Sequence, residues 1–335
     1  MRLLISMPNF STLFTWSCLQ TANKGKCWLL KKSLYGLRQS GYEWNKHLTR
    51  TLLSNGFTQG KADPCLFTKG EEKAIILVFV DDLAIFTRDE KSANEIVKML
   101  KRNYKLRDLG EIKNYLGVEI KRHEKGLKIA QRSKILKLLK QYKMEECKGA
   151  IIPMNVEFQT ENVTGPDCDI EMYRSLIGSL LYLSRWSRPD ISIAVNLLAR
   201  NVSKPTERHW QAAKRVLRYL KETQNKELNL EPKGELRITA YADANYGNDV
   251  VTRRSTSGIT VHLGGSIVNW KTARQKFISL SSAESEYAAL SELCTDLIFY
   301  KQLAPDIGMD LKEPISVSED NQAVIHMVNS PNVKN

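Results

Sequence analysis

Two apolar runs that meet at a pair of adjacent carboxylates constrain the fold of this chain most. The run Ala74-Ile-Ile-Leu-Val-Phe-Val80 precedes Asp81 and Asp82, and the run Leu83-Ala-Ile-Phe86 follows them. Runs of this length and composition predict two buried strands. Their junction contains neither Gly nor Asn, the residues that a tight hairpin normally uses for positive φ. The pattern therefore predicts a hairpin whose acids have a purpose other than making an easy turn.

The two acids have two readings, as solvated turn residues or as ligands of a cation. Adjacent anions repel each other unless positive charge lies beside them. Mg²⁺ prefers hard oxygen ligands and keeps coordination positions open for substrate phosphates. We therefore treat Asp81 and Asp82 as candidate catalytic and metal-binding residues, with Mn²⁺ as the alternative ion.

Charge and composition indicate the class of partner. Fifty Lys and Arg against 37 Asp and Glu give a formal charge of +13, and 42% of the 335 residues are hydrophobic. This composition favours a globular protein of two or three domains with a polyanionic partner, nucleic acid ahead of membrane. The apolar opening Met1 to Leu19 could imitate a secretory signal, but Pro8 and Asn9 interrupt it. No other stretch approaches the roughly 20 apolar residues of a membrane span, so we expect no membrane partner. The cysteines lack zinc-ligand spacing, and reduced thiols suit an intracellular protein, cytoplasmic or nuclear and not secreted.

Hydrophobic periodicity predicts further elements along the chain. Helices are expected at 92–104, 133–142, 171–185, 190–201, 206–222, 282–302 and 322–329. Strands are expected at 115–121, 127–130, 236–242, 256–263, 266–270 and 315–318. Thr206 is a plausible N-cap, and the polar stretch at 155–170 is the expected linker.

Two of the predicted helices carry a set of basic residues that could contact the phosphates of a duplex. The set comprises Lys137, Lys140, Lys214, Arg215, Arg218 and Lys221. Each phosphate neutralised contributes roughly −0.9 to the log–log salt slope of binding to B-DNA. Any one of these side chains could instead belong to a solvated helix face.

A second group of acids lies near expected element ends in the last third of the chain. Asp243 follows an apolar strand, Glu284 and Glu286 open the long helix, and Asp320 follows a short strand. Residues two apart on a helix point to nearly opposite sides, so both glutamates cannot face one site. Glu286 shares the apolar face of the helix, where a carboxylate needs a compensating partner such as a cation.

Each of these acids also has a plainer explanation. Asp243 could be a turn residue that terminates its strand, and Asp320 could be the N-cap of the following helix. Glu284 is explained by the helix dipole, which favours an acid in the first turn. The combination of Asp243, Glu286 and Asp320 nevertheless favours metal binding.

Several motifs resemble copia-type retrotransposon Pol polyproteins. Phe79-Val-Asp-Asp82 resembles the metal-binding hairpin of their reverse transcriptase, and Leu34-Tyr-Gly-Leu-Arg-Gln-Ser40 resembles the segment that lines its nucleotide pocket. Tyr173-Arg-Ser-Leu-Ile-Gly-Ser-Leu-Leu-Tyr182 is similar to their connecting region. The segments around Asp243, Glu286 and Asp320 resemble their ribonuclease H domain, together with Arg254-Ser-Thr-Ser-Gly258.

This resemblance implies an α+β fold with a partial reverse-transcriptase palm and thumb at 27–154. It also implies a helical connection at 171–232 and an incomplete ribonuclease H-like α/β domain at 233–335, while 1–26 matches nothing in the family. Asp81 and Asp82 would hold polymerase metals, and Tyr35, Gly36 and Gln39 would bind the deoxynucleotide. Asp243, Glu286 and Asp320 would hold the two Mg²⁺ ions that cleave the RNA strand of an RNA:DNA hybrid.

Two departures from the family pattern limit the expected activities. The family carries a catalytic aspartate upstream of Leu34, and residues 1–26 contain no aspartate. A further family aspartate would follow Asn335. We therefore expect little polymerase activity on a template-primer and weak or absent hybrid cleavage. The alternatives are a nucleic-acid-binding protein without catalysis and an unstable pseudogene product.

Overall fold

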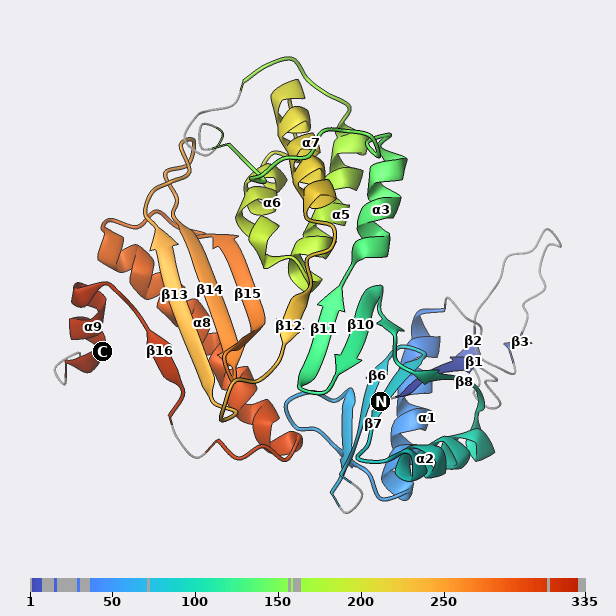
Figure 1. Cartoon of the computed structure of the whole chain (residues 1–335). Helices are drawn as coiled ribbons and strands as arrows, with labels where there is room; N and C mark the ends of the chain where they lie inside the picture. Colours follow the sequence, from blue (N-terminus) through green and yellow to red (C-terminus); the bar gives the residue numbers. More distant parts are fainter. Residues whose placement is uncertain are drawn as a thin grey trace. The chain divides into compact units, whose positions relative to one another are not determined.

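The computed structural model describes residues 2–7, 15–16, 29–30, 37–70, 73–155, 158, 164–311 and 314–330. These residues form mixed helices and sheets (Figure 1), which confirms the predicted α+β class. The chain divides into two compact units, each described by itself below. One unit comprises Met1–Ile112 with Phe299–Leu311, and the other comprises Lys113–Ile298 with Lys312–Asn335. The domain boundaries expected from the sequence stay predictions.

The first unit is built on a mixed-order sheet of strands β4-β5-β6-β7-β1-β8. Its strands are β1 (Arg2–Met7), β4 (Thr58–Gln59), β5 (Leu66–Lys69), β6 (Ala74–Phe79), β7 (Asp82–Phe86) and β8 (Lys105–Glu111). Strands β2 (Thr15–Trp16) and β3 (Leu29–Leu30) form a separate antiparallel pair. The β6–β7 hairpin is the one that the two apolar runs predict.

Helices α1 (Arg38–Ser54) and α2 (Glu90–Asn103) supply the rest of the core of the first unit. The Asp89 side chain caps α2 by accepting a hydrogen bond from the backbone N–H of Ser92 at 2.8 Å. Helical spacing then buries Ile96 and Leu100 on one face. These residues pack in one cluster with Leu48 of α1 and the inward residues of the sheet.

The second unit begins with a four-stranded sheet in the order β12-β11-β10-β9. Its strands are β9 (Asn114–Tyr115), β10 (Val118–His123), β11 (Gly126–Ala130) and β12 (Leu228–Leu230). The single strand predicted at 115–121 is wrong, because Leu116 and Gly117 adopt φ of 49° and 76° and break it into β9 and β10. Strand β12, which the sequence did not predict, pairs with β11 across about 100 residues of chain.

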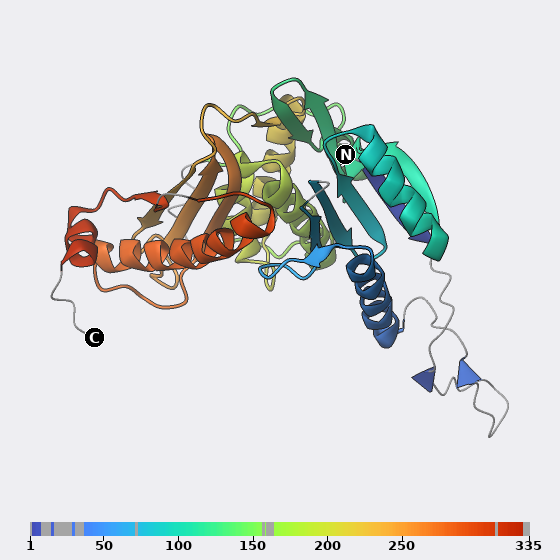
Figure 2. The ribbon, with the colours of Figure 1, turned by 90° about the horizontal axis from the view of Figure 1, so that it is seen from below.

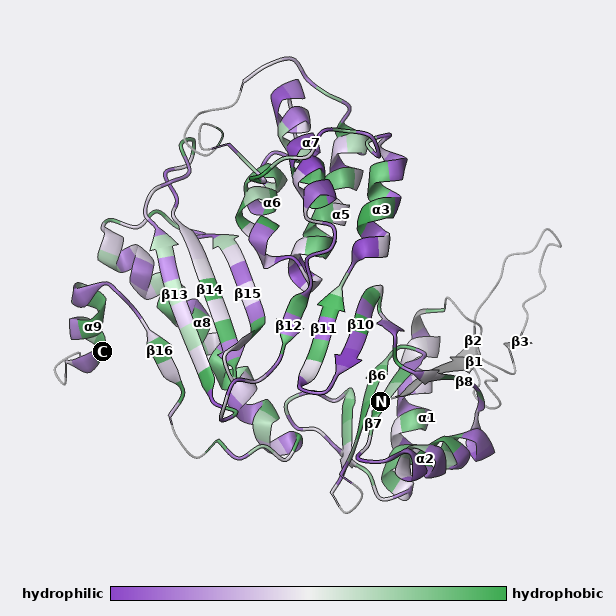
Figure 3. Cartoon of the chain, viewed as in Figure 1, coloured by the Kyte–Doolittle hydropathy of each residue, from purple (hydrophilic) through white to green (hydrophobic). Residues whose placement is uncertain are grey.

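A helical layer follows in the second unit. It contains α3 (Arg132–Gln141), α5 (Ile170–Trp186), the short 3₁₀ helix η1 (Pro189–Ile191), α6 (Ser192–Ala199) and α7 (Glu207–Glu222). Thr206 caps α7 in a reciprocal box with His209, as predicted for the cap position. Figure 3 shows α7 largely hydrophilic on its visible side, because its apolar residues, among them Val216 and Leu217, face the common core. Most of the predicted linker lies outside the described residues.

A third sheet, in the order β15-β14-β13-β16, carries Asp243 of the second group of acids. Its strands are β13 (Ile238–Asn245), β14 (Thr256–Leu263), β15 (Ser266–Arg274) and β16 (Ser316–Ser318). Helix α8 (Ser282–Asp306) crosses one face of this sheet (Figures 1 and 2), and α9 (Gln322–Asn329) follows β16. Strands β13 and β15 are longer than predicted, so Asp243 lies inside β13 and does not terminate it.

The helical layer is joined to the edge strand β15 by polar contacts. The Trp270 indole N–H donates to the Ser184 carbonyl at 2.6 Å, and the Asn196 amide donates to the Thr272 carbonyl at 3.0 Å. The hydroxyls of Ser192 and Thr272 lie 3.1 Å apart. The helical layer and the third sheet are therefore hydrogen-bonded to each other within the second unit.

Asp249 forms a second junction between these two parts. Its carboxylate accepts hydrogen bonds from Arg200, at the end of α6, and from Arg274, at the end of β15, both at 3.0 Å. Thr252 donates to the other carboxylate oxygen through its backbone N–H and its hydroxyl. These bonds lower the pKa of Asp249 well below its usual value although burial opposes the shift. The ion pairs are partly shielded from water, since Asp249 itself is buried.

No helix within the described ranges has the length and apolar content needed to cross a bilayer.

Candidate functional site

The first acidic pair lies on the β6–β7 hairpin. Phe79 and Asp82 are paired across the hairpin, so Val80 and Asp81 form the turn. Val80 adopts φ of 54°, a conformation that is strained for a β-branched residue. The indole N–H of Trp44 donates to the Val80 carbonyl at 2.6 Å. The hairpin is thus held in an unfavourable turn that presents two half-buried carboxylates side by side.

The electrostatics of this pair favour a cation. Burial, and then the negative charge of Asp81, raise the pKa of Asp82 above its ordinary value. Strand β1 lies next to β7, with Ile5 opposite Asp82. The segment Arg2-Leu-Leu-Ile-Ser-Met7 contains no acid, so the neighbouring strand adds no third carboxylate.

The predicted nucleotide-binding residues are only partly described. Tyr35 and Gly36 lie outside the described residues, and Gln39 is exposed in the first turn of α1. Their roles stay predictions.

The second group of acids is organised by the parallel pairing of β13 with β16. Thr239 pairs with Ser316 and Tyr241 with Ser318. The same offset, carried two residues further, places position 320 beside position 243. Two acids from distant parts of the chain thus reach the same end of adjacent strands, and both Asp243 and Asp320 are exposed there.

Glu286 approaches these strands from the first turns of α8. It is 7% exposed, while Glu284 is exposed, which is the asymmetry expected from helical spacing. The backbone N–H of Ala244, on β13, donates to the Glu286 carboxylate. Its Oε2 atom is buried and has no hydrogen-bond partner. Such an oxygen is unfavourable unless a proton or a cation compensates it.

The neighbouring acids reinforce this conclusion. Burial, and then the charges of Asp243 and Glu319, raise the pKa of Glu286 to about 7. Asp320 contributes in the same direction. Near neutral pH the Glu286 carboxyl is therefore divided between its protonated and ionised forms.

The sequence pattern does not indicate Glu319, but the structure places its side chain among these acids. Its Oε1 accepts from the Asn321 backbone at 3.0 Å, and its Oε2 is buried without a partner. The N-cap explanation for Asp320 is wrong, because the Asn321 side chain caps α9 by accepting from Ala323 and Val324. Its position directly before Asp320, just after the end of β16, is the sequence signal that could have indicated Glu319.

Carboxylates fit the preference of Mg²⁺ for oxygen ligands, and the unpartnered Glu286 oxygen is the observation that supports a cation here. In the described part of the chain, no three His, Cys, Asp or Glu side chains are already gathered at metal-holding geometry. Asp243 and Asp320 are exposed, whereas Glu286 is buried. Metal binding by these residues stays a proposal.

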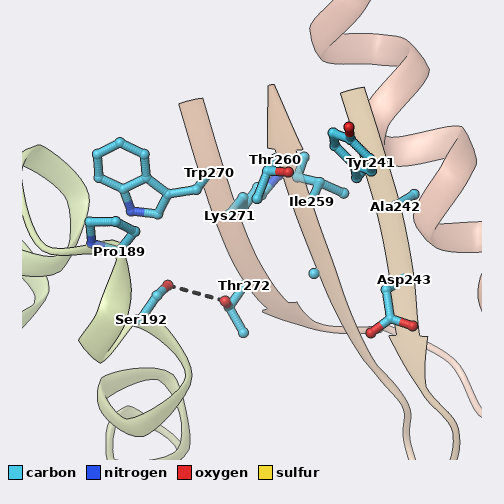
Figure 4. A pocket seen from close by; sticks show the side chains of 11 residues that line it. Pro189, Ser192, Tyr241, Ala242, Asp243, Ile259, Thr260, Trp270, Lys271 and Thr272 are labelled. Atoms are coloured by element: carbon cyan, nitrogen blue, oxygen red, sulfur yellow. Dashed lines mark hydrogen bonds between the residues drawn. The ribbon is translucent and has the colours of Figure 1, made fainter. Parts of the chain in front are cut away.

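A hollow of about 290 Å³ begins at Asp243 and extends across β14 to β15. Figure 4 shows Tyr241 and Asp243 at its β13 end, and Trp270 beside Pro189 at the other. The connecting helices close this second end through Pro189 and Ser192.

The six predicted phosphate-binding residues divide into two groups. Lys137 and Lys140 are exposed on α3. Arg218 donates to the Lys148 carbonyl at 2.7 Å, and Lys221 donates to the Cys147 carbonyl at 2.7 Å. Arg218 and Lys221 thus brace the loop after α3, and Lys214 and Arg215 are half-buried beside them. Lys137 and Lys140 are the better placed for a solvent-borne ligand.

Comparison with known proteins decides the family. Residues 17–156 match the family described as reverse transcriptase (RNA-dependent DNA polymerase). A putative transposon Ty5-1 protein of Saccharomyces cerevisiae is 30% identical over 280 residues, which cover 82% of this chain and 91% of that protein. The chain belongs to the copia-like retrotransposon Pol family.

Longer relatives extend the likeness. The retrovirus-related Pol polyprotein from transposon RE1 of Arabidopsis thaliana is 34% identical over 305 residues, or 90% of this copia-like chain. The copia-like chain spans 21% of the length of that relative. A solved structure described as a foamy viral protease-reverse transcriptase in complex with double-stranded DNA covers 94% of the chain and 50% of its own chain. Its sequence identity to this chain is 17%, and the TM-score is 0.22.

The raised pKa of Glu286 gives a testable pH dependence. The folded chain binds this proton more tightly than the unfolded chain, so the contribution of Glu286 to stability is fully present below pH 4.5 and is lost as the pH rises through about 7. In the presence of a chelator, the free energy of unfolding of the unsubstituted chain should fall by up to about 3 kcal/mol as the pH rises from 4.5 through 7, because of Glu286. In Glu286→Gln this decrease should be absent. Urea unfolding of both proteins between pH 5 and 8 measures it. Parallel pH profiles for the two proteins would contradict the assignment.

Proposed function

We propose that this copia-like Pol chain binds an RNA:DNA hybrid and cleaves its RNA strand slowly with Mg²⁺. The acids Asp243, Glu286 and Asp320 would hold the ion in the ribonuclease H-like region at 233–335. The observation that supports this most is the buried, unpartnered oxygen of Glu286 beside the edge of β13. The chain would act inside the cell, in the cytoplasm or the nucleus, with Mn²⁺ as an alternative ion.

Each acid would have a separate part in the site. The Ala244 N–H orients Glu286 and leaves its second oxygen free for a cation. Asp243 supplies a carboxylate from a rigid strand, and Asp320 supplies one from the end of the parallel neighbour. When bound, Mg²⁺ supplies Lewis acidity toward the scissile phosphate and lowers the pKa of a coordinated water. The protein side chains fix where that phosphate lies.

On this proposal, metal binding depends on the charge state of Glu286. A carboxylate with a pKa of about 7 is not fully ionised at neutral pH, and the protonated form is a poor metal ligand. We infer that metal affinity and cleavage both increase between pH 6.5 and 8.5.

We further propose that Asp81 and Asp82 can bind a divalent cation but support little template-directed synthesis from deoxynucleotides. A two-metal polymerase site needs further carboxylate ligands beside the pair. The adjacent strand β1 carries no acid at any of its positions. Robust extension of a primer on an RNA template by the purified chain would refute this part.

The exposed Lys137 and Lys140 would contact phosphates of the hybrid. On this proposal, replacing both by Gln reduces the salt dependence of hybrid binding by about two charges, since each phosphate contact contributes roughly one counterion. The bracing residues Arg218 and Lys221 would contribute less, because their donors already bond loop carbonyls.

The test is incubation of the purified chain with an end-labelled RNA:DNA hybrid in Mg²⁺, in Mn²⁺ and in chelator. Slow cleavage that requires metal, and that spares an RNA single strand, supports the proposal. Hybrid binding of equal strength in metal and in chelator, without cleavage, would instead support a non-catalytic nucleic-acid-binding protein. A chain without a cooperative thermal transition would support the unstable pseudogene product.

A further inference from the structure

We propose that the hollow beside Asp243 is a subsite for one ribonucleotide of the strand whose phosphate lies at the acids. The inference rests on the proposed function and adds the substrate contact that the acids alone do not supply. Three observations support it. They are the cross-strand register of β13, β14 and β15, the glycine at position 258, and the wall that η1 and α6 of the helical layer add.

The floor of the hollow consists of two cross-strand rows on the same face of the sheet. Residues that pair directly across neighbouring strands share a face, and residues two apart on a strand share it too. The rows are Tyr241, Thr260 and Trp270, and next to them Asp243, Gly258 and Thr272. Aromatic rings therefore stand at the two ends of the first row, and the proposed metal ligand Asp243 begins the second.

Gly258 leaves the second row open between Asp243 and Thr272. A Cβ placed on Gly258 would have the Asp243 carbonyl, at 4.0 Å, as its nearest neighbour. The position does not need positive φ, so neither turn geometry nor a close backbone contact within the chain explains the glycine. Glycine in a strand interior costs stability and often marks the close approach of a ligand.

The connecting helices complete the hollow. Pro189 and Ser192 form its wall on the β15 side, where the Ser192 hydroxyl meets the Thr272 hydroxyl (Figure 4). The bond from the Trp270 indole to the Ser184 carbonyl fixes the ring against the helical layer. The wall is therefore held by hydrogen bonds, and the hollow has a defined shape before a ligand arrives.

The chemistry of the lining indicates the class of ligand. Aromatic rings stack on a base that has left its pair with the DNA strand, and the hydroxyls of Thr260, Thr272 and Ser192 suit the hydroxyls of a ribose. The volume of about 290 Å³ is of the order of one nucleotide. Lys271 also lines the hollow, and its ammonium is ion-paired with Glu292. Asp243 lines the hollow and is also one of the proposed metal ligands. A nucleotide bound in the hollow would therefore place its own phosphate at the acids.

Filling the hollow tests the inference. We expect Gly258→Val to weaken binding of a labelled RNA:DNA hybrid about tenfold, since the lost stacking of one base is of that size. Valine favours a strand and its Cβ meets open space, so the melting temperature should stay the same or rise. Fluorescence anisotropy in Ca²⁺, which limits cleavage during the measurement, gives the affinity.

The control is Gly178→Ala, at an exposed helical glycine of α5 whose Cβ would meet nothing within 4 Å. It should leave hybrid affinity unchanged. Tyr241→Ala provides a second test that does not add volume, because the ring is 49% exposed and its loss leaves the core intact. It too should weaken hybrid binding several-fold.

The outcomes separate this inference from the proposed function. Unchanged affinity in folded Gly258→Val and in Tyr241→Ala overturns the subsite, even if the acids prove to bind metal. Weakened affinity in both variants supports the subsite, even if Asp243→Asn has no effect on cleavage and the proposed catalysis fails. Absence of hybrid binding by the unsubstituted chain overturns both.

Discussion

Asp243→Asn and Glu286→Gln should each lower the metal-dependent rate of hybrid cleavage at least about 100-fold, because each removes a charge on which the cation depends. Glu286→Gln should retain the fold and should even be more stable at pH 8, since its amide ends the repulsion from Asp243 and Glu319. Cleavage of an end-labelled hybrid under single-turnover conditions measures the effect.

The matched control for this prediction is Glu284→Gln. Glu284 lies two residues before Glu286 on the same helix, is exposed, and accepts a hydrogen bond from the Leu280 backbone. Its replacement should change the cleavage rate by less than about threefold, because it has no part in holding the cation. Equal loss in Glu284→Gln and Glu286→Gln would show that the effect comes from the helix end and not from the site.

Asp249→Ala should lower the free energy of unfolding by about 3 kcal/mol, because it leaves the guanidinium of Arg200 buried without its counter-charge. Asp249 also accepts hydrogen bonds from Arg274 and Thr252. Its replacement therefore removes the acceptor that joins α6, β15 and the loop after β13. Chemical unfolding followed by circular dichroism measures the change.

A surface ion pair provides the control for Asp249. Glu235 and Arg237 form a pair whose side chains are 76% and 61% exposed. Glu235→Ala should change the free energy of unfolding by less than about 0.5 kcal/mol. If Asp249→Ala cost no more than Glu235→Ala, the Asp249 cluster would not be the joint between the connecting helices and the sheet.

Local patterns predicted the parts of this chain that depend on short-range periodicity. The β6–β7 hairpin follows from two apolar runs, and Thr206 was predictable as a cap because helix starts have a specific chemistry. The burial of Glu286 and the exposure of Glu284 follow from 3.6 residues per turn. In these cases the deciding interactions lie within a few residues of each other.

The features that were missed depend on partners far away in the chain. Strand β12 has three residues and exists because β11 offers its edge. Asp249 reads as an ordinary loop residue until α6 brings Arg200 to it. The gap left by the missing side chain of Gly258 lies between Asp243 and Thr272, which come from the neighbouring strands β13 and β15. No sequence window contains these relations, so periodicity could not predict them.

A cation site at Asp243, Glu286 and Asp320 is tested most directly by titrating the metal-free chain with Mn²⁺ at pH 8. The electron paramagnetic resonance signal measures the free ion. We expect bound Mn²⁺ in the unsubstituted chain and in Glu284→Gln, and loss of that binding in Asp243→Asn and Glu286→Gln. The Asp81 and Asp82 pair could also hold an ion, so Asp81→Asn with Asp82→Asn serves as the background for all of these proteins. Equal Mn²⁺ binding by Glu286→Gln and Glu284→Gln in that background, or no binding at all, would contradict a cation site at Asp243, Glu286 and Asp320.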